Sequence, residues 1–76
     1  MNINSKRYQN MVEKRTKISN RMSDLRGIIR KATEQYRDLR YGQYYEGKAQ
    51  DLDRLEKIKR DAEIEYLELE LRNKSI

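Results

Sequence analysis

The 76-residue chain contains no cysteine and no histidine. It therefore lacks thiol nucleophiles, the imidazole of the common hydrolytic triads and the soft ligands of structural zinc sites. The three glycines, Gly27, Gly42 and Gly47, lack the spacing of a phosphate-binding loop, and Asp51-Leu52-Asp53 lacks the remainder of a calcium loop. We expect a protein that is not an enzyme and that uses no metal, no cofactor and no small-molecule substrate.

Long apolar runs are also missing from the chain. No run of apolar residues exceeds two, whereas a membrane span needs about 20 and the core of a signal peptide about 7–15. We expect no membrane partner, no secretory signal and a location in the cytoplasm.

Hydrophobic residues are scarce for a chain that has to fold. Leu, Ile, Val and Phe together number 15 of 76, while 18 Lys or Arg and 13 Asp or Glu give a net charge of +5. Domains of this size bury only about 60% of their unfolded surface and usually need disulfides, metals or oligomerisation as well. Because the first two are excluded, a single domain over residues 1–76 has to rely on regular helix packing or on assembly with further chains.

The first half of the chain carries a continuous heptad pattern, with apolar residues at alternating steps of three and four. Its positions are Tyr8, Met11, Arg15, Ile18, Met22, Leu25, Ile29, Ala32, Tyr36 and Leu39. This spacing predicts a coiled-coil-like helix over about residues 5–41. Arg15, the one charge in the pattern, either fixes register or oligomeric state or simply reaches solvent. Gly42 is expected to end the helix with a left-handed cap.

A turn is predicted over residues 42–47, where Gln43 to Glu46 lack a helical pattern and lie between two glycines. A second apolar pattern follows and predicts a helix over about residues 48–72. Its positions are Leu52, Leu55, Ile58, Ala62, Tyr66 and Leu69. Ile64, Leu67 and Leu71 form another stripe on the same helix, and a helix with two apolar faces is expected to have two neighbours.

Charge separates the two halves of the chain. Residues 1–41 carry 11 basic and 4 acidic groups, and residues 42–76 carry 7 basic and 9 acidic groups. Folding back near Tyr44 brings opposite charges together, which favours a hairpin over the alternative of one continuous rod. We predict an all-α, antiparallel two-helix hairpin that leaves residues 1–16 uncovered and dimerises into a four-helix bundle through its uncovered apolar surfaces.

Three groups of residues are candidates for binding a partner protein. They are Tyr8, Met11, Val12 and Arg15 at the start of the first helix, Tyr41, Tyr44 and Tyr45 at the turn, and Ile64, Leu67 and Leu71 on the second helix. Tyrosine is favoured at interfaces because it is amphipathic and has few rotamers. Alternatively, Tyr41 and Tyr45 fold over the end of the hairpin and close its core.

The basic first helix also makes nucleic acid an alternative partner. Arg7, Lys14 and Arg21 recur every seven residues on one row, about 10 Å apart along the helix axis, and Lys17 adds to the row. Such a row can follow a phosphate backbone. The competing interpretation is a solvated charged face.

The turn resembles that of a known family of secreted hairpins. Tyr45-Glu46-Gly47-Lys48-Ala49 looks like the W-x-G-x-A turn of the small helical-hairpin proteins exported by type VII secretion systems, with Tyr45 at the position of the tryptophan. This resemblance implies two long helices on either side of the turn.

The start of the second helix resembles a different family. Ala49-Gln50-Asp51-Leu52-Asp53 is similar to the S-Q-E-L-D motif of the sporulation-regulator aspartyl-phosphate phosphatases, which are also helical hairpins; here Ala49 replaces the serine and Asp51 the glutamate. The resemblance implies that Asp53 would act on the aspartyl phosphate of a response regulator.

The small size, the high charge and the uncovered apolar surfaces are typical of interaction proteins. We predict a basic, non-enzymatic regulator, inhibitor or assembly factor, of the kind encoded by phages or mobile elements, which lays helix faces on another protein or on a second copy of itself. A scaffold subunit fits the same features. The alternatives are a nucleic-acid-binding accessory protein and, further off, a phosphatase-like regulator.

Overall fold

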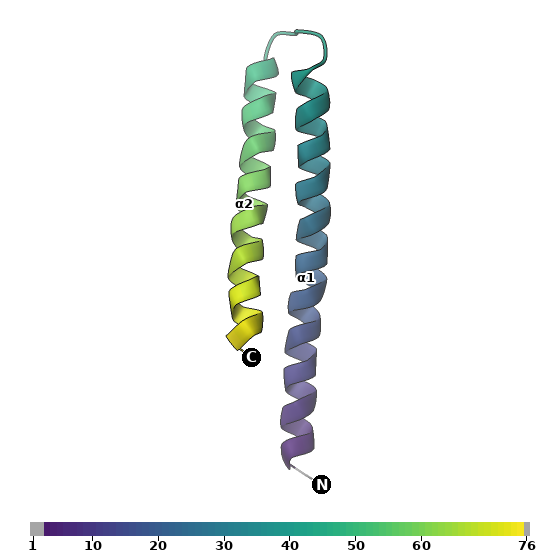
Figure 1. The fold of residues 1–76 in the computed structure, drawn as a ribbon, viewed down its shortest axis with the longest axis vertical. Helices are drawn as coiled ribbons and strands as arrows, with labels where there is room; N and C mark the ends of the chain where they lie inside the picture. The colour runs from purple at the N-terminus through teal and green to yellow at the C-terminus, as the bar shows by residue number, and fades with distance from the viewer. Residues whose placement is uncertain (1–2, 76) are drawn as a thin grey trace.

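The computed structural model describes residues 3–75 and contains two helices, α1 (Ile3–Arg40) and α2 (Lys48–Ser75). No residue of this described range lies in a strand. Figure 1 shows the chain rising along α1, crossing the connecting segment and returning along α2, so that the two helices lie side by side. The molecule is a rod of 65 × 15 × 14 Å. The prediction of an all-α helical hairpin is therefore confirmed.

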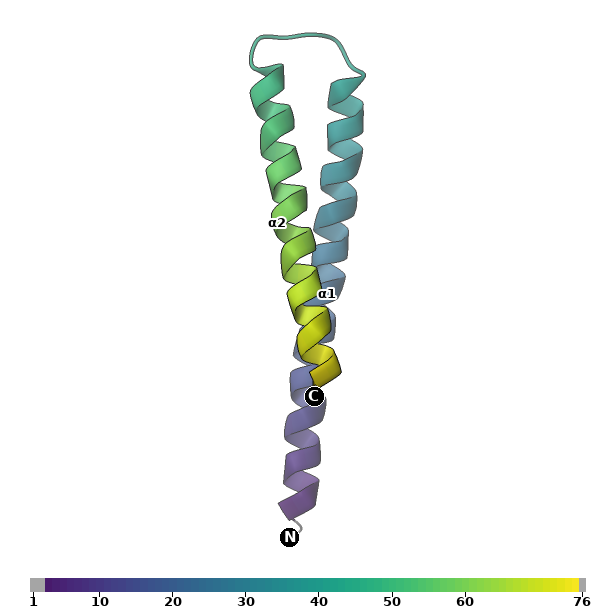
Figure 2. The same cartoon turned by 60° about the vertical axis from the view of Figure 1, so that its left-hand side comes forward.

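The two helices differ in length by ten residues, since α1 has 38 and α2 has 28. At about 1.5 Å per residue, α1 extends roughly 15 Å beyond the end of α2, and both views show its start standing free (Figures 1 and 2). The uncovered part is shorter than predicted, because α2 continues to Ser75 and so reaches the level of Lys14. We call the described residues 3–13 of α1 the overhang.

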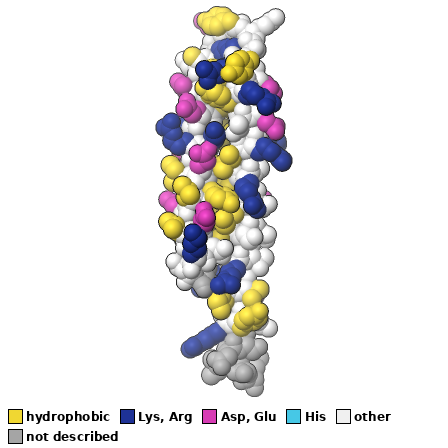
Figure 3. All heavy atoms as spheres, in the orientation of Figure 1, with side chains coloured by type: hydrophobic (Ala, Val, Ile, Leu, Met, Phe, Trp, Pro, Cys, Tyr) yellow, Lys and Arg dark blue, Asp and Glu magenta, His cyan; other side chains and the backbone are white. Residues whose placement is uncertain are grey.

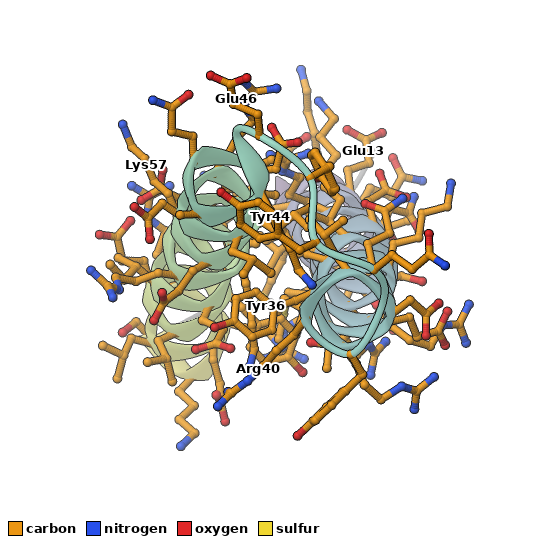
Figure 4. The ribbon with its side chains drawn as sticks, turned by 90° about the horizontal axis from the view of Figure 1, so that it is seen from above. Glu13, Tyr36, Arg40, Tyr44, Glu46 and Lys57 are labelled. Carbon is orange, nitrogen blue, oxygen red and sulfur yellow. The ribbon has the colours of Figure 1, made fainter. Side chains whose placement is uncertain are left out.

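A narrow seam of apolar side chains joins the helices. Leu25, Ala32 and Ala62 are the buried residues, with exposed fractions of 1%, 3% and 6%. The small side chains of the two alanines let the helices approach closely around Leu25. Tyr36 also lies between the helices when the rod is seen from its turn end (Figure 4). Other half-buried positions of the heptad pattern are Ile18, Met22, Ile29 and Leu39 on α1 and Leu52, Leu55, Tyr66 and Leu69 on α2.

One predicted seam position is wrong. Ile58 is 42% exposed, whereas its neighbour Lys59 is half-buried. Lys59 lies four residues after Leu55 and three before Ala62. This spacing keeps the alternating steps of three and four that relate the other seam positions of α2. The alkyl stem of Lys59 can lie along the seam while its ammonium group stays near the Glu63 carboxylate, 3.8 Å away.

The connecting segment is held by a glycine and by a lysine. Gly47 has a φ of +90° and is the one described residue with a left-handed backbone, so the left-handed cap predicted at Gly42 is wrong. Gly42 instead makes room, because a Cβ there would lie 3.0 Å from the carbonyl oxygen of Asp38. Lys48 Nζ donates to the carbonyl oxygens of Arg40 (3.2 Å) and Gly42 (2.8 Å), which caps the end of α1.

Replacing Gly47 or Gly27 by alanine should change the free energy of unfolding in opposite directions. Gly47→Ala should lower the free energy of unfolding by about 1 kcal/mol, because an L side chain strains a backbone at positive φ. Gly27→Ala should raise it by about 1 kcal/mol, since Gly27 lies within α1 and nothing within 4 Å would meet the added methyl group. Thermal unfolding followed by circular dichroism measures both, and equal effects would contradict this account of the turn.

The burial of Leu25 predicts a second, larger effect. Leu25→Ala should lower the free energy of unfolding by about 3 kcal/mol, because it removes the most buried side chain of the seam. The matched control is Leu67→Ala, which makes the same change at an exposed position of α2 and should cost within about 0.5 kcal/mol. Urea titration below the concentration of assembly compares the two variants. Similar losses would show that the seam is not the core.

Candidate interaction surfaces

Apolar side chains on the overhang stand uncovered. Tyr8, Met11 and Val12 are all exposed. Tyr8 and Met11 continue the two heptad rows that α2 covers further along α1, so they point toward the line that α2 would follow if it were longer. Arg7 and Lys14 flank Met11 in a shallow hollow of the helix surface. Figure 3 shows hydrophobic side chains gathered at this lower end of the rod, next to the residues drawn in grey. We call Tyr8, Met11 and Val12 the overhang surface.

A second apolar surface lies on α2, outside the seam with α1. Ile64, Leu67 and Leu71 are 50%, 58% and 65% exposed. Ile64 and Leu67 occupy positions opposite the seam, and Leu71 lines a groove together with Ile18 of α1. We call the three residues the outer stripe. Acidic residues border the outer stripe on both sides along the helix: Asp61, Glu63, Glu68 and Glu70. Hydrophobic side chains are visible along the α2 edge of the rod in Figure 3.

A groove of about 620 Å³ lies where the end of α2 meets α1. Its apolar wall comes from Ile18 and Leu71, and its basic rim comes from Lys14, Lys17 and Arg72. Within residues 3–75 none of these three cations forms an ion pair. Because Leu71 belongs to both the groove and the outer stripe, and Lys14 borders both the groove and the overhang surface, the three features are continuous.

An ion pair ties the two helices together beside the seam. The Arg21 guanidinium donates from Nε and Nη2 to both carboxylate oxygens of Glu65, the second at 3.0 Å. The row predicted to contact nucleic acid is therefore not uniform, since Arg21 already has a carboxylate partner. Arg15 lies exposed near the level where α2 ends.

This ion pair predicts a loss of stability in acid. The hydrogen bond from Arg21 lowers the pKa of Glu65 below its ordinary value of 4.5. Stability from the pair is therefore complete above the unfolded pKa and is lost as the pH falls through the lower, folded pKa. Glu65→Gln should flatten the fall in melting temperature between about pH 5 and about pH 2. Glu68→Gln is the control, because Glu68 forms no ion pair within the described chain; an equal effect there would contradict a specific role for Glu65.

The three tyrosines at the turn do not act together. Tyr41 and Tyr44 are 79% and 86% exposed, so the interpretation that Tyr41 closes the core is wrong. The Tyr41 ring lies 5.9 Å from the Arg40 guanidinium carbon, and Tyr44 lies above the space between the helices in Figure 4. The Tyr45 hydroxyl donates to Asp51 Oδ2 at 2.6 Å, and this hydrogen bond raises the pKa of Tyr45.

Two contacts of the turn were missed by sequence reasoning. They are the hydrogen bond from Tyr45 to Asp51 and the capping of α1 by Lys48. Asp51 lies in the first turn of α2, where its negative charge is favourable near the positive end of the helix dipole. Its position six residues after Tyr45 was a signal that could have predicted a link across the start of the helix.

The side chains that could bind a metal or take part in catalysis are dispersed over the described residues. Among them, no group of three or more acidic, His or Cys side chains is placed to hold a metal ion. Asp53, the residue that the phosphatase resemblance singles out, lies exposed on α2. Neither helix, over the described range, is both long and apolar enough to cross a membrane.

Comparisons with family models, with curated proteins and with solved structures gave no match for this chain.

Proposed function

We propose that this protein is a small, non-enzymatic interaction module that binds other helices through its exposed apolar faces. The observation that carries the proposal is the imbalance between core and surface. Three side chains are buried in the described hairpin, whereas the overhang surface and the outer stripe present six exposed apolar side chains. Exposed apolar patches of this kind mark sites of protein association.

The first partner is a second copy of the chain. A two-helix hairpin with no cysteine buries little apolar surface by itself, and assembly supplies further burial. The antiparallel hairpin then contributes two helices to a four-helix assembly in which both exposed faces are covered. The same faces can also bind another protein. The chain would then act as a regulator, an inhibitor or an assembly factor.

Assembly through apolar faces predicts a particular salt dependence. Light scattering at tens of micromolar should report a mass of two or more chains, and this mass should persist in about 1 M salt because apolar burial does not depend on counterions. Leu67→Lys should release the monomer, since it places a charge in the middle of the outer stripe.

Glu34→Lys on α1 is the control for the change in charge, because Glu34 is exposed, forms no described ion pair and lies away from both surfaces. A monomer of the unmodified chain would refute the proposed self-assembly. Association with DNA or RNA that is lost at the same high salt would favour the nucleic-acid alternative instead.

A further inference from the structure

The overhang and the outer stripe match in length. The overhang is the part of α1 that extends beyond the end of α2, and it is roughly 15 Å long. The outer stripe runs from Ile64 to Leu71, seven residues or about 10 Å along the axis of α2. One overhang is therefore just long enough to cover one outer stripe.

Their charges are opposite. The overhang and its edge carry Lys6, Arg7 and Lys14 against the one acid Glu13. Residues 61–70 of α2 contain no base, and four of their acids border the outer stripe: Asp61, Glu63, Glu68 and Glu70. The bases Arg60, Arg72 and Lys74 lie beyond its two ends, and Arg60 pairs with Glu56. Apart from Glu63, which lies 3.8 Å from Lys59, these acids form no ion pair within residues 3–75. The carboxylates of α2 are thus available to cations from another chain.

The topology of the hairpin allows both surfaces to be covered at once. The overhang surface faces the line of α2 just beyond Ser75, where residues 3–75 place no helix. A second hairpin rotated by 180° places its α2 on that line, with its outer stripe against the first overhang. The same rotation places the second overhang on the outer stripe of the first copy, so the contact is self-complementary.

We propose that a second copy of this chain docks tail to tail, each overhang lying on the outer stripe of the other. The inference deepens the proposed function, on which it rests, by naming which faces meet. The apolar side chains supply the affinity, and the charges select this orientation over others. The four helices then overlap only at their free ends, and the two turns lie at opposite ends of a long rod.

The arrangement predicts a specific crosslink. The chain has no cysteine of its own, so single cysteines report single contacts. Tyr8→Cys and Leu71→Cys change two side chains that are each 65% exposed, and neither should disturb folding. Mixed at equal concentration and treated with a short bis-maleimide, the two variants should form a covalent heterodimer. Tyr41→Cys mixed with Leu71→Cys is the matched control and should not crosslink, because the turns lie far from the contact.

The length of the dimer provides a second readout. Two hairpins of 65 Å that share only their two overhangs of about 15 Å each give a rod of about 100 Å. Small-angle X-ray scattering of the unmodified chain measures this maximum dimension. Full side-by-side overlap gives about 65 Å instead.

Each result decides the question. The Tyr8→Cys to Leu71→Cys crosslink together with a length of about 100 Å supports the tail-to-tail contact. A dimer of about 65 Å, or a crosslink from Tyr41→Cys to Leu71→Cys, overturns the contact and leaves the proposed function standing. A chain that stays monomeric in both experiments overturns the inference and the proposed self-assembly together.

Discussion

A single seam of apolar contacts between α1 and α2 holds this protein together, and every other feature depends on how little that seam buries. Leu25 is the one large side chain that is fully enclosed, and the alanines beside it bring the helices close without adding much area. A pair of helices packs along one line only, so the remaining faces of both are left to solvent or to other chains. The hairpin is consequently a fold with more apolar side chains than it can cover.

Direction and register come from polar contacts at the ends of the seam. The connecting segment returns the chain through the left-handed Gly47, the lysine cap on α1 and the hydrogen bond from Tyr45 to Asp51. Toward the free end, the pair of Arg21 with Glu65 links the helices at a matched level. Such exposed pairs contribute little free energy individually, yet they distinguish one register from a slip by a heptad.

The heptad pattern was sufficient to predict both helices, the turn between them and most seam positions, because regular packing leaves a regular signal. The choice between Ile58 and Lys59 was not predictable from hydrophobicity, since the half-buried residue there is a lysine and its isoleucine neighbour is exposed. The left-handed cap predicted at Gly42 was wrong because glycine can serve a turn in two ways. Its lack of a side chain serves the close approach to Asp38 and not a positive φ.

The overhang is a helical segment whose apolar face no other helix of the described chain covers. A segment of about ten residues is too short to be a stable helix in water by its own propensity, and over residues 6–13 α1 has no covering helix. The order of the overhang therefore depends on α1 continuing into the seam and on whatever covers its apolar face. A partner that supplies this cover gains apolar burial and stabilises the helix in the same step, so association and helix formation are coupled at this end of the rod.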